Sequence, residues 1–439
     1  MTGTHRLDYV ASPGGTLRGT LQVPGDKSIS HRAILLGGVS EGTTHITGFL
    51  QGEDTLATLA AFASMGVRIE RVGDEVTVHG RGLHGLEPPP GPIDLGNSGT
   101  AMRLMTGLLA GQRFDSVLIG DASLMTRPMA RVMTPLEMMS ASVTGSARHT
   151  APLHIEGGRR LRGIRYPLPV ASAQVKSCVL LAGLYAEGDT EVVEPEVTRD
   201  HTERMLEGFG YEIRRDQGIA LTGGGRLAGG GIAIPGDISS AAFFLVGACI
   251  ASGSELTVRG IGVNHTRDGV LRILEAMGAK LELHNHRIAG GEPVADINVT
   301  ASALRGIEIP PEWVPLALDE FPVLMVAAAA AEGTTTLSGA QELRVKESDR
   351  ITAVADGLMR LGIRCETRPD GMIVHGGELT GGTVQSFTDH RVAMAFAVAA
   401  LAASGPVTIE DCENVATSFP SFVGLANQAG LTVEERYAT

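Results

Sequence analysis

The sequence has few of the residues that mark several common protein classes. Its 439 residues include four cysteines, Cys178, Cys249, Cys365 and Cys412, which lie far apart without Cys-x-x-Cys spacing. Such spacing argues against a zinc site or a disulfide framework and is typical of reduced thiols. Aromatic residues are also scarce, at 4%, whereas glycine is abundant, with 58 residues. We therefore expect a core in which small residues let helices and sheets approach closely.

A positive charge surplus and long apolar runs are absent as well. The chain has 36 Lys and Arg against 49 Asp and Glu, a net charge of -13, which argues against a nucleic-acid or anionic membrane surface. Its most apolar runs, "AAFFLVGACIA" and "VAMAFAVAALAA", are much shorter than the roughly 20 residues of a membrane-spanning helix, so they predict buried helices. The N-terminus shows no secretory signal pattern, and we expect a cytoplasmic protein.

One pattern occurs six times along the chain. A polar segment precedes an Ala/Leu-rich stretch, a glycine and a β-like segment, and the copies align on Asp26, Asn97, Ser172, Asp237, Asp319 and Asp389. Amphipathic helices that end at glycine lie between the copies, as in "TLATLAAFASMGVRIE". The repeat predicts an α/β (α+β) fold of six units with buried first helices.

Two Pro-Gly pairs predict how the units are divided. The chain exceeds the roughly 250 to 300 residues that one core supports, so we expect two domains of three units each. Pro24-Gly25 and Pro235-Gly236 precede the first and fourth copies. We predict one lobe from residues 26–235 and another from 1–25 with 236–439, joined by a hinge that suits a cleft closing on a ligand.

Cationic and polar residues gather where the predicted buried helices begin. The unpaired N–H groups and partial positive charge of a helix start favour an anion. The residues at these starts are Lys27, Ser28 and Arg32; Asn97 and Gly99; Ser172 and Gln174; and Asp389, His390 and Arg391. Further cations lie on predicted loops, namely Arg127, Arg199, Lys346 and Arg350. Together they predict substrates that carry phosphate and carboxylate groups.

Each of these residues also has a purely structural explanation. Ser28, Thr100 and Ser172 are each explained singly as helix caps. Lys346 and Arg350 could pair with the acidic residues of "RVKESDR" on a solvated helix face. The same kinds of residue recur at equivalent helix starts, and helix caps that arose independently would not need to recur in this way. The recurrence therefore favours a binding site over separate caps.

Seven motifs, in order, resemble the 5-enolpyruvylshikimate-3-phosphate synthase family from about Leu21 to about Phe422: "PGDKSISHR", "GNSGTAMR", "MTRPM", "SAQVKS", "DEFP", "RVKESDR" and "TDHRVAM". The resemblance implies two lobes, each of three βαβαββ units. It implies transfer of the enolpyruvyl group of phosphoenolpyruvate to the 5-hydroxyl of shikimate-3-phosphate by addition and elimination, with release of phosphate, in aromatic amino-acid (chorismate) biosynthesis. It also implies a monomer with no metal or organic cofactor and no nucleic-acid or membrane partner.

The resemblance assigns roles motif by motif. At shikimate-3-phosphate it places Ser28 and Arg32 on the carboxylate, Ser172, Gln174 and Arg199 on the phosphate, and Asp319 and Lys346 on the hydroxyls. Around phosphoenolpyruvate it places Arg127, Arg350, Arg391, Asn97 and Gly99. Lys27 is expected between both substrates, and Glu347 and His390 complete the site. Asp319 is our candidate for the proton of the hydroxyl and Glu347 for that of C3, but the sequence leaves open how Asp319, Glu347 and Lys346 share the protons.

Some positions depart from the better-known members and point to a divergent bacterial subgroup. Ala173 replaces a second serine, and Thr417 replaces a lysine near phosphoenolpyruvate. Gly99 lacks the methyl group of the alanine that glyphosate-insensitive members often carry, so the steric barrier to glyphosate is absent. The loss of a cation at Thr417 and the tolerance common in this subgroup act in the opposite direction, and the sequence leaves the degree of glyphosate sensitivity open.

Two other classes of protein share some of these features. The related transferase acting on UDP-N-acetylglucosamine carries a loop cysteine that "GDASLMTRP" lacks. A non-catalytic two-lobed binding protein would explain the cations but not the carboxylates among them.

Overall fold

The computed structural model describes residues 6–438, which form two compact units. The N-terminal unit comprises Gly25–Ile234 and the short segment Ala289–Glu292. The C-terminal unit comprises the chain up to Pro24, Pro235–Ile288 and the chain from Pro293 onward. The chain therefore passes between the units at Ala289–Glu292 as well as near the two Pro-Gly pairs, and our boundary prediction did not include that short segment.

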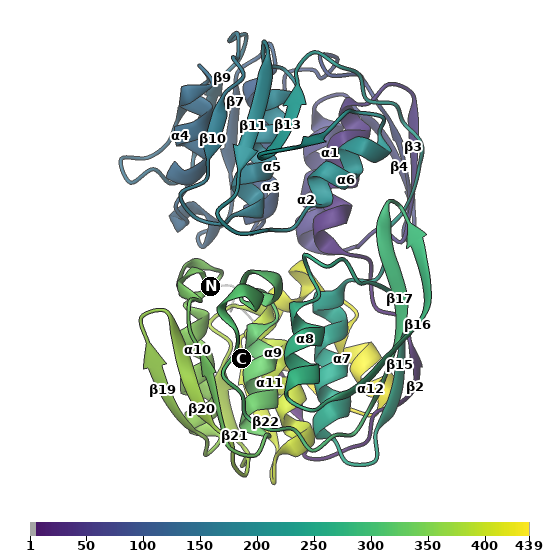
Figure 1. The fold of residues 1–439 in the computed structure, drawn as a ribbon, viewed down its shortest axis with the longest axis vertical. Coiled ribbons are helices and arrows are strands. Elements are labelled where there is room, and N and C mark those ends of the chain that lie inside the picture. Colours follow the sequence, from purple (N-terminus) through teal and green to yellow (C-terminus); the bar gives the residue numbers. More distant parts are fainter. Residues whose placement is uncertain (1–5, 439) are drawn as a thin grey trace. The chain divides into compact units, whose positions relative to one another are not determined.

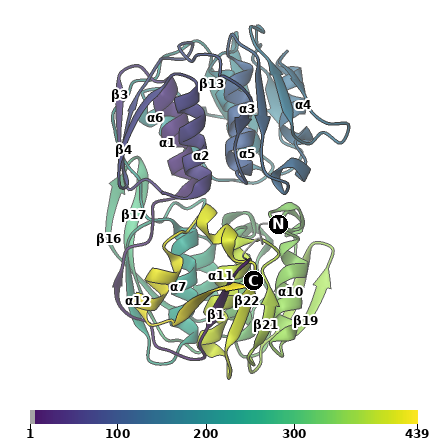
Figure 2. The same cartoon turned by 180° about the vertical axis from the view of Figure 1, so that it is seen from behind.

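The N-terminal unit contains three four-stranded sheets, and Figure 2 shows the helices that pack against them. Their strand orders are β14(Gly231–Ala233)-β3(Thr43–Thr47)-β5(Glu75–His79)-β4(Arg68–Val72), β6(Ile93–Asp94)-β7(Ser116–Ile119)-β9(Leu153–Glu156)-β8(Ser142–Thr144) and β10(Arg165–Pro167)-β11(Asp189–Val193)-β13(Ile219–Thr222)-β12(Arg214–Arg215).

The C-terminal unit contains the other three sheets (Figure 1). Their strand orders are β2(Arg18–Leu21)-β15(Glu255–Gly262)-β17(Glu292–Thr300)-β16(Lys280–Ala289), β18(Thr334–Leu337)-β20(Gly371–His375)-β19(Arg364–Arg368) and β21(Gly382–Gln385)-β22(Val407–Glu410)-β1(Arg6–Ala11)-β23(Val433–Ala438). In five of the six sheets of the described chain, a parallel edge strand starts the order. In the sixth, isolated parallel bridges such as Glu308 to Thr336 take its place.

Each sheet is accompanied by two helices, which confirms the predicted repeat. Those of the N-terminal unit are α1(Lys27–Val39), α2(Glu53–Ser64), α3(Gly99–Ala110), α4(Ala130–Met138), α5(Ala173–Gly183) and α6(His201–Gly208). Those of the C-terminal unit are α7(Ile238–Ile250), α8(Gly269–Ala276), α9(Phe321–Ala329), α10(Arg350–Arg360), α11(His390–Ala399) and α12(Phe422–Ala429). Short 3-10 turns are η1(Leu124–Thr126), η2(Pro311–Trp313), η3(Pro315–Ala317), η4(Gln341–Val345), η5(Ala400–Ala402) and η6(Glu413–Thr417).

Each unit includes a segment that is distant in the sequence from the rest of that unit. The first strands, β1 and β2, pair inside the C-terminal unit, β1 with β22 and β23 and β2 with β15. Conversely, the N-terminal unit includes Ala289–Glu292, the segment that joins β16 to β17 of a sheet in the C-terminal unit. Neither unit is therefore one uninterrupted stretch of sequence.

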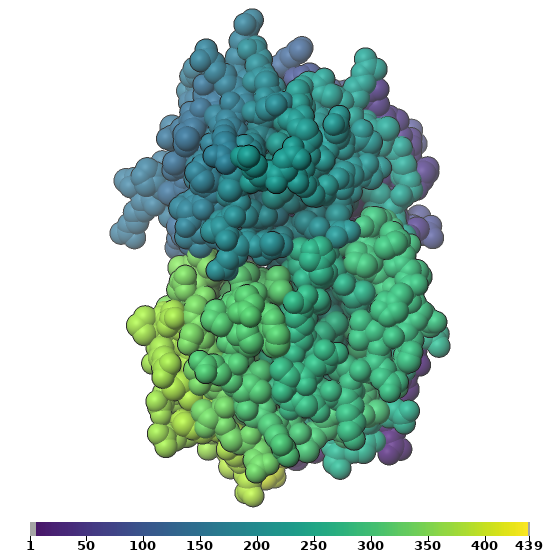
Figure 3. Space-filling view, viewed as in Figure 1, coloured from purple at the N-terminus to yellow at the C-terminus, as the bar shows by residue number. Residues whose placement is uncertain are grey.

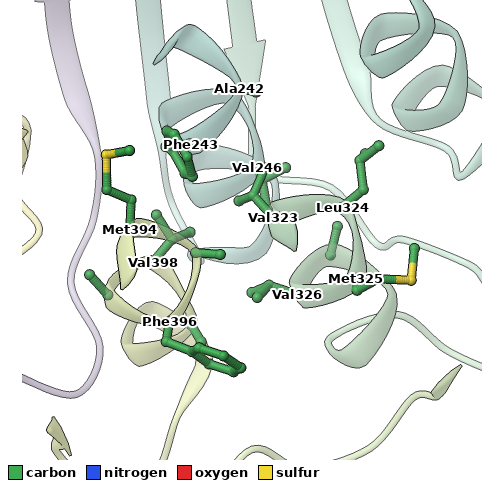
Figure 4. Packing of buried hydrophobic residues seen from close by; sticks show 14 of the residues in the cluster. Ala242, Phe243, Val246, Val323, Leu324, Met325, Val326, Met394, Phe396 and Val398 are labelled. Carbon is green, nitrogen blue, oxygen red and sulfur yellow. The ribbon is translucent and has the colours of Figure 1, made fainter. Parts of the chain in front are cut away.

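The odd-numbered helices form the core of each unit. In the C-terminal unit α7, α9 and α11 pack against one another, and Figure 4 shows Phe243, Val246, Val323, Val326 and Phe396 among the side chains that meet there. Each of the three helices is buried on all of its sides. Burial of one apolar side chain of this size contributes about 1.5 to 3 kcal/mol to the free energy of unfolding. In the space-filling view of Figure 3, the surrounding chain covers these helices on the face drawn. Within residues 6–438, no helix combines the length and apolar character needed to cross a bilayer.

Glycine permits a close helix contact in the N-terminal unit, between α3 and α5. A Cβ atom added at Gly107 would lie 2.1 Å from the backbone oxygen of Cys178. The exposed Gly424 in α12 has no heavy atom within 4 Å of an added Cβ.

We predict opposite effects of alanine at these two glycines. Gly107→Ala should lower the free energy of unfolding by about 2 kcal/mol or more, because two packed helices must separate. Gly424→Ala should raise it by about 0.5 to 1 kcal/mol, because alanine favours a helix. Urea unfolding of both variants tests this, and equal stabilities would contradict the packing argument.

Candidate active site

Side chains cap five of the six odd-numbered helices. Asp26, Ser98, Ser172, Asp237 and Asp389 each accept a hydrogen bond from a backbone N–H of the first helical turn, at 2.8 to 3.4 Å. The capping explanation therefore holds for Ser172. Ser28 and Thr100 instead lie within the first turns of α1 and α3, next to the caps.

Lys27 and Arg32 on α1 are held by different kinds of partner. Lys27 Nζ lies 2.5 Å from Asp54 Oδ2, at the start of α2. The Arg32 guanidinium is buried and donates to Thr202 Oγ1 at 2.6 Å, Ser177 Oγ at 2.8 Å and the Ser28 carbonyl at 2.9 Å. All three acceptors are neutral, so they fix the orientation of the group without cancelling its charge.

Burial lowers the pKa of Arg32 to about 10, although the nearby carboxylates of Glu203 and Asp26 act in the opposite direction. Arg32 is therefore still cationic near neutral pH. Burial, together with the charges of Lys27 and Arg32, also lowers the pKa of His31 well below its ordinary value. The His31 ring lies 2.7 Å, Nδ1 to Oγ1, from Thr58, so α1 contributes a neutral imidazole beneath its two cations.

Arg127 and Asn97 form a second set, at the start of α3. Arg127 Nη2 donates to Asn97 Oδ1 at 2.5 Å, and Asn97 Nδ2 donates to Asp121 Oδ2 at 2.6 Å. Gly99 lies beside the same guanidinium: an added Cβ would be 3.1 Å from Arg127 Nη1 and 3.0 Å from Arg103 Nη1. The structure thus brings together three of the residues predicted near phosphoenolpyruvate.

Gln174 connects α5 to α3 through a residue that the sequence analysis missed. Gln174 Oε1 accepts from Arg103 Nη1 at 2.6 Å, and its Nε2 donates to Thr100 Oγ1 at 3.0 Å. The motif "GNSGTAMR" contained Arg103, but its role as a partner depends on a contact 71 residues away. Burial is the main cause of the lowered pKa of Arg32, and the positive charge of the nearby Arg199 lowers it further.

Arg350 is the centre of the set in the C-terminal unit. Its fully buried guanidinium donates to Asp389 at 2.9 Å, to Asp319 at 3.1 Å and to Glu347 at 2.6 Å. Burial opposes the charged form, but Asp389, Glu347 and Asp319 outweigh it and raise the pKa of Arg350. The predicted ion pair with Glu347 therefore exists, but its guanidinium is buried and its carboxylate is partly buried, so it does not lie on a solvated helix face.

The other predicted residues of this unit surround Asp319 and α11. Lys346 Nζ donates to Asp319 Oδ1 at 3.2 Å, and Arg391 Nη1 donates to the Asp319 carbonyl at 3.2 Å. His390 Nδ1 lies 3.5 Å from the hydroxyl of Thr417, the position where many relatives were expected to carry lysine. Some predicted residues of each unit are thus in contact with one another: Arg32 with Ser28 and Arg127 with Asn97 in the N-terminal unit, and Arg350, Lys346 and Arg391 with Asp319 in the C-terminal unit.

Comparisons with known proteins first define a class. The enolpyruvyl transferase NikO from Streptomyces tendae has a TM-score of 0.79 at 16% identity, over 99% of this chain and 100% of that chain, so the two share a fold. EPSP synthase from Acinetobacter baumannii has a TM-score of 0.88 at 54% identity, over 98% of this chain and 100% of that chain.

Closely similar relatives then identify the family. The 3-phosphoshikimate 1-carboxyvinyltransferases of Methylococcus capsulatus and Halorhodospira halophila are 58% and 60% identical, over 97% of this chain and 98% and 97% of those proteins. The family model EPSP synthase (3-phosphoshikimate 1-carboxyvinyltransferase) matches residues 11–425. This chain belongs to the EPSP synthase family, as the motifs predicted.

We predict that Arg350 stabilises the fold as well as the site. Arg350→Ala leaves three carboxylates without their shared cation, two of them largely buried, and should cost about 3 to 5 kcal/mol of unfolding free energy. Lys346→Ala, at a more exposed cation on the same Asp319, should cost less than about 1 kcal/mol. Denaturant unfolding compares the two variants, and similar losses would argue against the buried network.

Proposed function

We propose that the residues at the starts of the buried helices bind and activate the two substrates of this family's reaction. That reaction transfers the enolpyruvyl group of phosphoenolpyruvate to the 5-hydroxyl of shikimate-3-phosphate and releases phosphate, in aromatic amino-acid biosynthesis. The observation that carries the proposal is that the motif residues form hydrogen-bonded sets at these helix starts, in a chain 58% identical to a 3-phosphoshikimate 1-carboxyvinyltransferase over nearly its whole length. Action as a monomer, without a nucleic-acid or membrane partner, stays a prediction.

The N-terminal unit is proposed to supply the contacts for the carboxylate and the phosphate of shikimate-3-phosphate. Ser28 and Arg32 receive its carboxylate, and Ser172, Gln174 and Arg199 receive its phosphate. The neutral partners of Arg32 support this assignment, because they leave its positive charge available to an anion. Lys27 lies on the first turn of the same helix, where it can reach both substrates once they displace Asp54.

Phosphoenolpyruvate is assigned to Arg127, Arg350 and Arg391, beside Asn97 and Gly99. Arg350 is already paired with Glu347 and Asp319, so a bound substrate carboxylate competes with both of them. A carboxylate that loses its arginine partner holds a proton more readily. Substrate binding thereby prepares the acidic groups for proton transfer.

Asp319 and Glu347 are proposed to carry the two protons. As the 5-hydroxyl oxygen bonds to C2 of phosphoenolpyruvate, the hydroxyl loses its proton, on the Asp319 side, and C3 gains one, on the Glu347 side. Loss of phosphate from C2 and of a proton from C3 then restores the double bond. Lys346 Nζ lies 3.2 Å from Asp319 Oδ1 and is proposed to take part, with Asp319, in proton transfer from the 5-hydroxyl. His390 is proposed to line the site.

We predict that turnover depends on Arg127 and Lys27. Both Arg127→Ala and Lys27→Ala should lower the rate of phosphate release from the two substrates by about 10²- to 10⁴-fold. Each substitution removes a positive charge that stabilises the negative charge developing in the transition state. Arg165→Ala, at an exposed ion pair with Glu191, is the matched control and should keep native turnover. A native chain without phosphate release would refute the proposed function.

We also predict that Gly99→Ala reduces inhibition by glyphosate. The added methyl would lie about 3 Å from the guanidinium groups of Arg127 and Arg103, which narrows the place where the longer inhibitor must fit. Inhibition of both proteins is measured at matched phosphoenolpyruvate concentrations. Equal inhibition would show that the methyl group does not control access.

A further inference from the structure

The hairpin formed by β16 and β17 brings a buried carboxylate to the N-terminal unit. Its two-residue turn, Gly290-Gly291, has φ values of 57° and 81°, as a type I′ turn requires. The strands belong to a sheet of the C-terminal unit, but the hairpin tip, Ala289–Glu292, packs within the N-terminal unit. Figure 1 labels both strands.

Polar contacts and a close backbone approach attach the hairpin tip to the N-terminal unit. Glu292 is 1% exposed, and its Oε1 lies 2.7 Å from Nδ1 of the buried His201. Arg204 Nη1 donates to the Gly291 carbonyl at 3.3 Å, and a Cβ added at Gly290 would lie 2.5 Å from the Ala233 oxygen. Because an unpaired carboxylate is costly to bury, the His201 contact contributes to the stability of Glu292 in this position.

His201 belongs to a turn that also carries candidate substrate contacts. It begins α6, two residues after Arg199. The next residue, Thr202, accepts the Arg32 Nε hydrogen bond at 2.6 Å and lies 2.7 Å from Ser177 Oγ. The charge of Glu292 also acts on Arg32, which places the hairpin tip close to that guanidinium.

We infer that Glu292 is a positioning residue for shikimate-3-phosphate: through His201 it fixes the start of α6, and thereby the side chains of Arg199 and Arg32. The inference rests on the proposed function. Asn97 and Arg127, which are assigned to phosphoenolpyruvate, bond to each other, and Asn97 also donates to Asp121. Loss of Glu292 should therefore weaken one substrate and spare the other.

Steady-state kinetics of phosphate release test this role. Glu292→Ala should raise the KM for shikimate-3-phosphate about tenfold, because a small displacement of two cations weakens their contacts with the substrate. The KM for phosphoenolpyruvate and kcat should stay within about twofold. Glu292→Gln keeps an oxygen that accepts the His201 N–H and should restore most of the native KM.

A matched control lies on the same hairpin. Glu282 pairs with His284 at 3.3 Å but is exposed, so Glu282→Ala should leave all kinetic constants unchanged. Thermal unfolding of each variant checks folding. If Glu292→Ala does not fold, Glu292→Asp carries the test, because it keeps the charge but shortens the reach to His201.

The outcomes separate the two proposals. An active native enzyme whose folded Glu292 variants keep the native KM for shikimate-3-phosphate overturns the positioning role alone. Equal changes in both KM values and in kcat, without rescue by Glu292→Gln, show a merely structural role and also overturn it. A native chain that releases no phosphate overturns the proposed function and this inference together.

Discussion

The first N–H groups of a buried helix constrain much of this structure. An apolar helix can bury its sides against sheets and other helices, but the N–H groups of its first turn have no partner within the helix. Asp26, Ser98, Ser172, Asp237 and Asp389 supply acceptors for five such starts. Polar groups must therefore collect at these helix starts, which are the places where substrate residues are proposed.

Capping carboxylates in turn require cations of their own. Asp389 is fully buried and caps α11 while it binds Arg350. Asp237 caps α7 and lies 3.4 Å from the buried Arg267, which also donates to Ser239. A network of arginines and carboxylates thus follows from the burial of helix starts, because an uncompensated carboxylate there would be costly.

Local signals predicted much of the fold, whereas contacts between distant segments were not readable. Apolar stretches predicted the odd-numbered helices, but Pro135 inside α4 obscured the helical pattern there. Thr202 was not identified as a partner of Arg32, because that contact joins residues 170 positions apart. The adjacent Gly290-Gly291 between two strands was a readable hairpin signal, although what its tip contacts depends on the tertiary structure.

Arg32 and Arg350 are supported in different ways, and the difference matches the proposed chemistry. Arg32 donates to hydroxyl and carbonyl oxygens, which orient a guanidinium but leave its charge to attract an anionic substrate. Arg350 is held by carboxylates, which largely neutralise it. Such a neutralised set binds an anion less strongly, but a substrate carboxylate that enters it displaces acidic groups able to accept a proton. An arginine held by neutral oxygens therefore suits the binding of an anionic substrate, and an arginine held by carboxylates suits the proton transfers that follow.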